Sequence, residues 1–166
     1  YILPWEAARR REIEPNDLRE MVVGDKLRDW SGSQCDPAVF PYDSRSFRPV
    51  KEDFCLPLFR YLWSYRTNLA NSKMFGGKTK VQTGIRWYEY GRLTHNKLCT
   101  PFSIAFAFVA THNHFVLDRG GKVFKQSAPI VKLLADATED DHLALLGLLN
   151  SSTACFWMKQ TFHNKG

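Results

Sequence analysis

A long apolar stretch in the C-terminal half is the clearest strand signal in the sequence. From Phe102 to Ala110 the residues are mostly hydrophobic and barely alternate with polar ones, which predicts a strand buried on both faces. Three polar residues follow this strand, His112, Asn113 and His114, and a second strand is expected to begin at Phe115. The pattern therefore predicts a polar tip between two strands.

The segment after the polar tip contains turn-forming glycines. Residues Phe115–Asp118 and Lys122–Gln126 have the composition of short strands, and Arg119-Gly120-Gly121 lies between them. Paired glycines supply the left-handed backbone that a tight hairpin requires. We therefore expect these two strands to pair with each other.

Helical signals dominate the C-terminal end. Thr138 followed by three acidic residues is the pattern of an N-cap and an acidic first turn, and it predicts a helix to Leu149. The Asn-Ser-Ser sequence at 150–152 is expected to end this helix and to cap the next one, from about Thr153 to Thr161. The apolar residues of this helix pair are expected in the core: Leu145, Leu146, Leu148, Leu149, Phe156 and Trp157.

The N-terminal half predicts shorter elements. Short helices are expected at Trp5–Glu12 and near Pro15, short strands at Met21–Gly24 and Ala38–Tyr42, and a longer helix from Asp53 to Leu69 that starts near Pro57. Between residues 71 and 84, glycines and lysines indicate a mobile, basic loop. The aromatic run 85–90 fits either a strand or a helical turn.

Together these elements indicate an α+β fold, with a small mixed or antiparallel sheet that contains a hairpin and is packed by helices, including a C-terminal helix pair. We expect residues 1–166 to form a single domain, with a leading segment at 1–50 and a core with a basic face at 51–166. The chain starts at Tyr1 without a methionine and stops just after a helical stretch, so we expect a piece of a longer protein.

Cysteine spacing and hydropathy indicate the cellular setting. The four cysteines, Cys35, Cys55, Cys99 and Cys155, are scattered and form no CxxC pair, which is typical of reduced thiols rather than of a disulfide scaffold or structural zinc. The sequence contains no apolar run of about 18 residues and no signal-peptide pattern. We therefore expect a cytoplasmic protein without a membrane partner.

Positive charge is concentrated in the middle of the chain. Residues 1–50 carry 8 Lys/Arg and 9 Asp/Glu, residues 51–100 carry 9 and 3, and residues 101–166 carry 6 and 5. Such a basic block suits a polyanion, because each neutralised phosphate releases condensed counterions. A solvated basic face without a partner is the alternative.

The polar tip has three interpretations. Imidazole and carboxamide groups at a strand end hydrogen-bond base edges or phosphates. They equally form an ordinary hairpin end that satisfies local backbone groups. A metal site would use His112 and His114 on one face of a strand, with His142, Cys99 or Cys155 nearby. No carboxylate or cysteine stands at ligand spacing, and we predict no metal.

A second candidate site is the run Arg86-Trp87-Tyr88, which combines a cation with aromatic rings that stack on bases or pack beside phosphates. The same rings fit a core position. Lys122 and Lys125 add donors further along the chain. The P-loop, GxGxxG, GxSxG and Asn-Pro-Pro-Tyr type motifs are all missing from the sequence, so we expect no catalysis by this segment.

Longer strings of the sequence carry a family resemblance. The segment 97–160 resembles the TaqI-like C-terminal specificity domain of adenine-specific DNA methyltransferases, on the strings FVLDRGGKVF (115–124) and LLNS (148–151). The strings VGDKLRDW (23–30) and FPYD (40–43) look like the start of the same domain. More narrowly, THNHFVLDRGGKVFKQSAPIVKL and LNSSTACFWMKQ closely resemble the PglX family of methyltransferases from BREX phage-defence systems.

This resemblance implies a target recognition domain, which binds double-stranded DNA and selects the site whose adenine a separate catalytic domain of the same chain flips and methylates. S-adenosylmethionine is then expected in that catalytic domain, and no cofactor in this segment. The residues expected at the DNA are His112, Asn113 and His114 at or near a groove, Trp87 and Tyr88 as supporting or stacking groups, and Arg86, Lys97, Arg119, Lys122 and Lys125 on phosphates.

Two other functions stay open. The segment is alternatively a module that binds another protein of the same restriction-modification or phage-defence system, through its polar first 50 residues. A metal-dependent nuclease is the more distant alternative. Salt-dependent binding to duplex DNA would favour the recognition domain over the protein-binding module, and absence of bound metal in elemental analysis would remove the nuclease.

Overall fold

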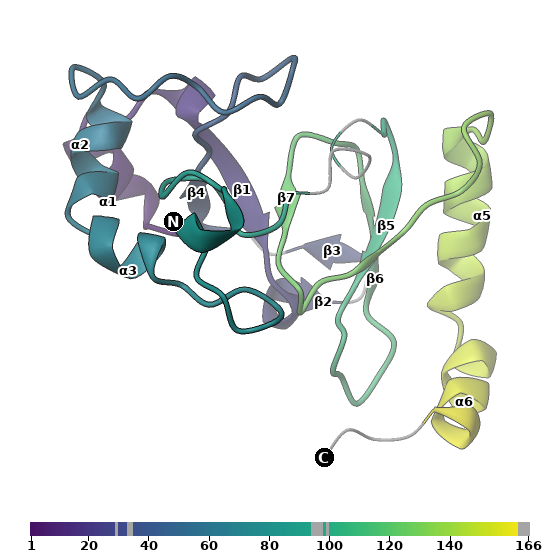
Figure 1. The fold of residues 1–166 in the computed structure, drawn as a ribbon. Helices are drawn as coiled ribbons and strands as arrows, with labels where there is room; N and C mark the ends of the chain where they lie inside the picture. Colours follow the sequence, from purple (N-terminus) through teal and green to yellow (C-terminus); the bar gives the residue numbers. More distant parts are fainter. Residues whose placement is uncertain (29, 33–34, 94–97, 99, 163–166) are drawn as a thin grey trace. The chain divides into compact units, whose positions relative to one another are not determined.

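The computed structural model describes residues 1–28, 30–32, 35–93, 98 and 100–162, and Figure 1 shows how they fold. The chain divides into two compact units: unit 1 consists of residues 1–19 and 37–95, and unit 2 of residues 20–36 and 96–166. Each unit is therefore built from two separate stretches of sequence. The predicted boundary at residue 50 coincides with neither of these limits, and the single domain stays a prediction.

Unit 1 is mainly helical. It contains the helices α1 (Trp5–Arg10), α2 (Pro57–Trp63) and α3 (Arg66–Ala70), the 3₁₀ turns η1 (Pro15–Asp17) and η3 (Val81–Thr83), and the strand β4 (Pro37–Val39). Pro57 begins α2, where its missing N–H costs nothing because the first turn has no intrahelical acceptor for it. The predicted helix starts near Trp5 and Pro57 are thus confirmed.

The long helix predicted from 53 to 69 is interrupted at Ser64 and Tyr65. Tyr65 leaves the helical conformation (φ −110°, ψ 6°), and its N–H bonds to the Leu62 carbonyl at 2.9 Å. The interruption sets the Arg66 guanidinium over the Trp63 ring, 4.7 Å from its centroid. The prediction of helix was right and the prediction of continuity was wrong.

The core of unit 1 is aromatic. Phe59 and Tyr88 are buried and meet edge to face, with ring centroids 5.0 Å apart. The aliphatic residues Val39, Leu58 and Leu62 belong to the same cluster. The run 85–90 forms a turn, which was one of the two alternatives, and it places Trp87 and Tyr88 in this core.

Unit 2 contains a three-stranded antiparallel sheet with the order β6-β5-β8, where β5 is Ser103–Phe106, β6 is Phe115–Asp118 and β8 is Ile130–Val131. The β5–β6 register runs from Ser103 opposite Asp118 to Phe106 opposite Phe115, which confirms two strands joined through the polar tip. The first strand is shorter than predicted. It ends at Phe106, and Phe108 and Val109 lie exposed in the connection.

The predicted hairpin between 115–118 and 122–126 is not formed. Strand β7 (Val123–Phe124) pairs instead in parallel with the end of β1 (Leu18–Val22), with Met21 opposite Val123. Gly120 and Gly121 do take left-handed φ angles of 88° and 80°, as a tight turn requires. The chain after them is held by β1, because the Lys125 N–H bonds to the Val22 carbonyl at 2.9 Å.

The stretch 20–36 of unit 2 also contains the 3₁₀ turn η2 (Gly24–Lys26) and a ribbon of β2 (Leu27–Arg28) and β3 (Ser31–Gly32). Gly24 allows a close approach to the loop after β7. A Cβ atom on Gly24 would lie 2.3 Å from the Ser127 carbonyl oxygen, and the Gly24 N–H bonds to Ser127 Oγ at 3.1 Å. Any larger residue here would separate the two segments.

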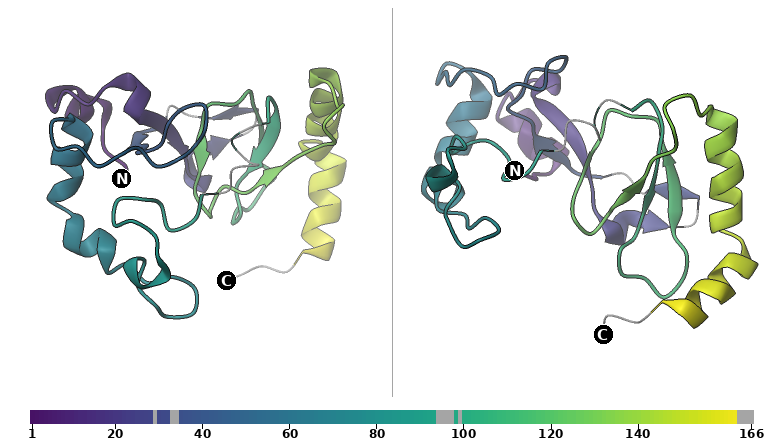
Figure 2. Two further views of the ribbon diagram at one scale, coloured as in Figure 1. Left: turned by 45° about the horizontal axis from the view of Figure 1, so that its top comes forward. Right: turned by 45° about the vertical axis from the view of Figure 1, so that its right-hand side comes forward.

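The C-terminal helix pair is confirmed. Helix α5 (Glu139–Leu149) begins with a capping box, in which Thr138 Oγ1 accepts from the Asp141 N–H and Asp141 Oδ2 accepts from the Thr138 N–H. Helix α6 (Ser152–Thr161) is capped by Ser151 Oγ, which accepts from the Ala154 N–H at 3.1 Å. The two helices run along one side of the β5–β6 sheet in both views of Figure 2.

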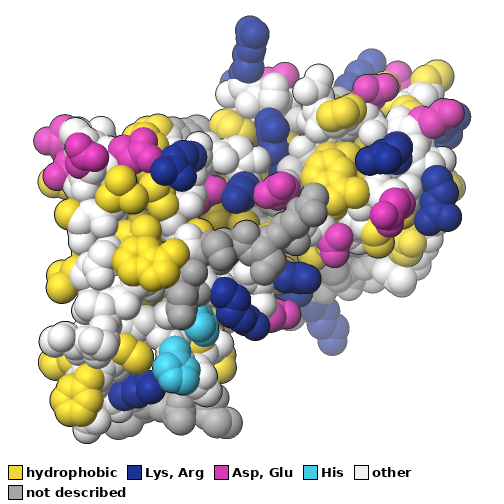
Figure 3. All heavy atoms as spheres, turned by 180° about the vertical axis from the view of Figure 1, so that it is seen from behind, with side chains coloured by type: hydrophobic (Ala, Val, Ile, Leu, Met, Phe, Trp, Pro, Cys, Tyr) yellow, Lys and Arg dark blue, Asp and Glu magenta, His cyan; other side chains and the backbone are white. Residues whose placement is uncertain are grey.

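The prediction that all apolar residues of the pair are core is wrong in part. Leu146 is buried against Ile104 and Phe115 of the sheet, and Leu145 and Leu149 are half-buried beside them. The other three residues are exposed: Leu148 by 64%, Phe156 by 68% and Trp157 by 59%. Figure 3 shows hydrophobic side chains over this helix column. The observed architecture is α+β, as predicted, and none of the helices in the described part has the length and apolar character that crossing a membrane requires.

Candidate nucleic-acid interface

The two units differ in net charge. Within their sequence limits, unit 1 has 14 Lys/Arg and 8 Asp/Glu, whereas unit 2 has 9 of each. The whole excess of +6 in the chain therefore belongs to unit 1. All of it comes from residues 37–95, which carry 10 basic and 4 acidic side chains, because residues 1–19 carry four of each.

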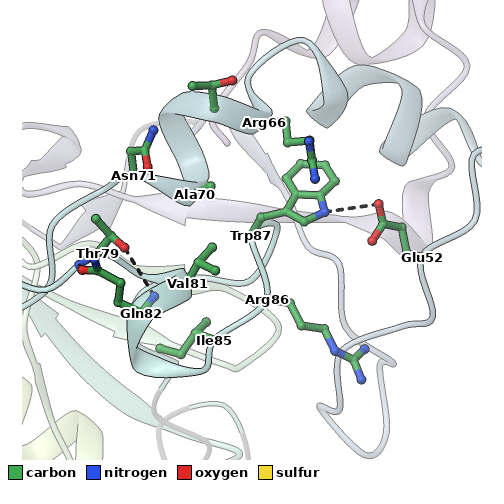
Figure 4. Close-up of a pocket in the computed structure, with 11 residues that line it drawn as sticks. Glu52, Arg66, Ala70, Asn71, Thr79, Val81, Gln82, Ile85, Arg86 and Trp87 are labelled. Atoms are coloured by element: carbon green, nitrogen blue, oxygen red, sulfur yellow. Dashed lines mark hydrogen bonds between the residues drawn. The ribbon is translucent and has the colours of Figure 1, made fainter.

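A pocket of about 660 Å³ lies on unit 1 between α3, η3 and the aromatic turn. Figure 4 shows the side chains that line it, which include two arginines and three neutral hydrogen-bonding groups: Arg66, Arg86, Asn71, Thr79 and Gln82. Gln82 is fixed by Thr79, because its N–H donates to Thr79 Oγ1 and its Oε1 accepts from the Thr79 N–H at 2.9 Å. The pocket therefore has preformed polar walls.

Trp87 forms one wall of this pocket and is otherwise part of the core. Its indole Nε1 donates to Glu52 Oε1 at 3.2 Å, and Arg66 and Glu52 line the same pocket (Figure 4). The Trp63 ring packs against it with centroids 5.9 Å apart. In this environment Trp87 is buried, with 8% of its surface exposed.

Arg86 is oriented by its neighbours while its side chain remains 54% exposed. Its Nη1 donates to the Tyr88 hydroxyl at 2.8 Å, and Glu89 Oε1 lies 4.0 Å from its Nε. The Tyr88 hydroxyl in turn donates to the Val50 carbonyl at 2.7 Å. Tyr88 is buried, so of the two predicted roles it can only support Arg86 and cannot stack on a base.

Lys80 belongs to the basic block but lies inside the molecule. It is only 2% exposed, and its Nζ bonds to the Tyr1 hydroxyl at 3.0 Å and to the Trp87 carbonyl at 3.4 Å. Burial lowers the pKa of this amine, and the nearby Glu89 acts in the opposite direction. One of the cations counted in the sequence is therefore structural and unavailable to a phosphate.

The polar tip of unit 2 is residues 107–114, which connect β5 to β6 near α6 (Figure 1). His112 is exposed, with its Nδ1 3.0 Å from Thr111 Oγ1. Asn113 Nδ2 donates to the Leu149 carbonyl at 2.6 Å. Asn113 thus satisfies a carbonyl at the C-terminal end of α5, which is the ordinary structural role that the sequence left open.

Asn150 holds the end of the tip through hydrogen bonds to Phe115. The sequence predicted only that Asn150 ends a helix, and this second role was missed. Its Oδ1 accepts from the Phe115 N–H at 3.1 Å and its Nδ2 donates to the Phe115 carbonyl at 2.8 Å. Strand β6 is at the edge of its sheet, so these two backbone groups would otherwise have no strand partner. The tip is therefore anchored to the α5–α6 junction by two asparagines.

A groove of about 870 Å³ runs between the tip and α6, lined by residues 106–115 together with Met158, Lys159, Gln160 and Phe162. Its chemistry is mostly apolar, with imidazoles and one lysine at the surface. Figure 3 shows histidine side chains on the face of unit 2 near the α6 end of the helix column. Across the described ranges no cluster of three His, Cys, Asp or Glu side chains is placed to bind a metal ion.

The remaining predicted cations of unit 2 are partly neutralised. Arg119 Nη2 lies 2.7 Å from Glu139 Oε1, and Lys122 Nζ lies 3.7 Å from Glu20 Oε2 and 3.8 Å from Asp118 Oδ1. Arg119 and Lys122 follow the end of β6 opposite to the tip, about 10 Å away along the strand. Lys125 is exposed. Lys97 falls outside the described residues.

The structure thus brings Arg86, Trp87 and Tyr88 together in unit 1 and the tip residues together in unit 2. Arg66, Asn71 and Gln82 were missed, because they join the pocket through turns that the sequence pattern does not reveal.

No protein-family model matches the chain. The sequence is 44% identical over 158 residues to the adenine-specific methyltransferase PglX of Streptomyces coelicolor. The chain is similar to one segment of that methyltransferase. The match covers 95% of the chain and 13% of the Streptomyces protein. The similarity to PglX expected from the sequence is therefore confirmed, and the TaqI-like specificity domain stays a prediction.

Proposed function

We propose that the chain is the DNA target recognition domain of an adenine-specific methyltransferase of a phage-defence system. In this role it binds duplex DNA and selects the methylation site. Another part of the polypeptide binds S-adenosylmethionine and transfers the methyl group. The observation that carries the proposal is the +6 excess of unit 1, which holds a pocket lined by Arg66 and Arg86, in a segment similar to a methyltransferase.

Unit 1 is proposed to supply most of the affinity. Arg86 and Arg66 lie at the pocket with their side chains at the surface, and the bond to Tyr88 orients Arg86 before DNA arrives. Preorientation reduces the entropy that a long side chain loses on binding a phosphate. Trp87 and Tyr88 then act as supports for these cations.

Unit 2 is proposed to supply selectivity through the tip. His112 is exposed at the end of a loop that Asn113 and Asn150 hold in place, so a base edge meets a positioned imidazole. The ion pairs of Arg119 and Lys122 are at the surface, where such pairs contribute only about 0–1 kcal/mol, so a phosphate can replace the carboxylate at low cost.

The test is fluorescence anisotropy with duplex DNA over a salt series. If about four phosphates are neutralised, affinity should fall about 100-fold between 50 and 200 mM salt. The double variant Arg66→Gln/Arg86→Gln should lose affinity and reduce the salt slope by about two. The matched variant Lys26→Gln/Lys132→Gln in unit 2 should leave both nearly unchanged. Absence of binding at low salt, or binding without salt dependence, would contradict the proposal.

A second candidate function is protein binding, favoured by three exposed aromatic residues at the C-terminal helix. Phe156, Trp157 and Phe162 are 68%, 59% and 64% exposed. Exposed apolar groups in this number are typical of contact surfaces. Since the chain covers 13% of its relative, the proposed occupant is another segment of the methyltransferase polypeptide, its catalytic domain. Phe156→Ser/Trp157→Ser would then disrupt that contact and leave DNA binding unchanged.

A further inference from the structure

A hairpin finger in unit 1 carries an exposed phenylalanine between two lysines. The finger consists of residues 72–80, with the sequence SKMFGGKTK. Phe75 at its end is 108% exposed, and Lys73 and Lys78 on the two arms are also exposed. A single exposed apolar residue is ordinary on a protein surface. What is unusual is that Phe75 lies at the end of a hairpin, between two exposed lysines.

The finger is held together by its own backbone. Lys80 N–H bonds to the Ser72 carbonyl at 2.9 Å, Lys73 and Thr79 form an antiparallel bridge, and Met74 N–H bonds to the Lys78 carbonyl at 2.8 Å. The turn closes with the Gly77 N–H on the Met74 carbonyl at 3.0 Å. The predicted mobile loop is therefore a small, hydrogen-bonded hairpin.

The two glycines of the turn make this shape possible. Gly76 and Gly77 have φ angles of 94° and 81°, which L side chains rarely adopt, and nothing lies within 4 Å of where a Cβ would be. The end of the finger is therefore narrow, with Phe75 as its only large side chain.

The base of the finger is fixed to the body of unit 1. The Lys80 side chain is buried beneath Tyr1 and Trp87, and Thr83 Oγ1 donates to the Lys80 carbonyl at 2.6 Å. Met74 turns inward, because a Cβ on Gly91 would lie 2.9 Å from its sulfur. Phe75, the next residue, is fully exposed. An apolar group is thus presented on a rigid, cationic projection.

We infer that this finger enters a groove of duplex DNA and places Phe75 against or between the bases, while Lys73 and Lys78 contact phosphates on either side. The inference rests on the proposed function and names a contact that the function does not require. Charge complementarity supports DNA as the occupant, because the finger belongs to the unit that carries the whole positive excess. Apolar wedges flanked by cations are a known means of unstacking a base step.

The experiment compares binding of the 166-residue chain to two duplexes of equal length, one fully paired and one with a single-base bulge. A bulge is already unstacked, so an inserting side chain should bind it about tenfold more tightly. Phe75→Ala should reduce this ratio to about one and retain the salt slope, whereas Phe75→Trp should restore the ratio. Because Phe75 is fully exposed, thermal unfolding should not change in either variant.

The lysines and a second apolar residue provide matched controls. Lys73→Gln and Lys78→Gln should weaken binding to both duplexes equally and each reduce the salt slope by about one. Leu134→Ala, at an apolar residue 81% exposed in unit 2, should leave the bulge preference intact.

The outcomes separate this inference from the proposed function. Salt-dependent binding with equal affinity for both duplexes, or a preference that persists in Phe75→Ala, would overturn the finger and leave the recognition domain standing. Phe75 would then be assigned to a protein-binding surface. No binding of the wild-type chain to either duplex at any salt would overturn both.

Discussion

The two compact units of this chain hold their charges in different ways. In unit 1 basic residues outnumber acidic ones by 14 to 8, and Arg86 bonds to the Tyr88 hydroxyl at 2.8 Å with the Glu89 carboxylate 4.0 Å away. In unit 2 the numbers are equal, and Arg119 and Lys122 each face a glutamate. An excess of charge favours affinity for a polyanion, whereas a cation in a surface ion pair must first give up a contact that contributes about 0–1 kcal/mol. The proposed division, with affinity from unit 1 and selectivity from unit 2, rests on this difference.

The largest effect is expected from a substitution that unfolds one unit, which tests whether the two units are independent. Phe59→Ala removes a fully buried ring from the core of unit 1 and should cost about 3–5 kcal/mol. Hydrogen exchange should show loss of protection in unit 1 with most protection retained at β5 and β6. The control is Phe54→Ala, because that ring is about half exposed. Equal loss of protection in both units would show that they unfold as one.

The next test concerns the anchor of the tip. Asn150→Ala removes both side-chain bonds to the Phe115 backbone and should lower the free energy of unfolding by about 2–3 kcal/mol, measured by urea denaturation. Asn68→Ala, an exposed asparagine of α3, should cost far less. If the two variants are equally stable, the anchor contributes nothing and the tip is positioned by other contacts.

A smaller effect is expected when the exposed imidazole is removed. His112→Ala should flatten sequence preference at one or more positions by about 1–3 kcal/mol of discrimination, with little loss of non-specific affinity. Selection from a random duplex library followed by sequencing measures this preference. Arg86→Gln is the contrasting variant, since it should weaken all sequences equally. If His112→Ala has the same sequence preference as the wild type, His112 does not take part in base recognition.

The smallest effect is a pH dependence of stability at Asp118. Burial raises the pKa of this carboxyl, against the bond from the Gly120 N–H and the attraction of Lys122. The folded state therefore binds the proton more tightly than the unfolded state, so the stabilisation is present at low pH and is lost as pH rises through the folded pKa. The stability of wild type relative to Asp118→Asn, measured by urea denaturation at a series of pH values, should therefore fall as pH rises above about 4.

Local patterns predicted the elements that depend on neighbouring residues. The capping box at Thr138 and Asp141, the helix stop at 150 and the polar tip before Phe115 were all visible because each is defined within a few positions. The helix break at Tyr65 could not be predicted, because no glycine or proline lies near it in the sequence.

Contacts between distant residues could not be predicted. Strand β7 pairs with β1, about one hundred residues earlier, although the glycine turn favoured a local hairpin. The sequence around Lys80 predicts a surface cation. Only the fold brings the Tyr1 hydroxyl, 79 positions away, to its amine. The exposure of Phe156 and Trp157 likewise depends on what the surrounding chain leaves uncovered.

The interleaving of the units also sets the order in which the chain can mature during synthesis. Unit 1 has all its residues once position 95 has left the ribosome, while the stretch 20–36 must wait for β7 at 123–124 before β1 gains its parallel neighbour. Long-range pairing of this kind is slow to form. The cationic unit can therefore assemble early, and the tip-bearing unit is completed last.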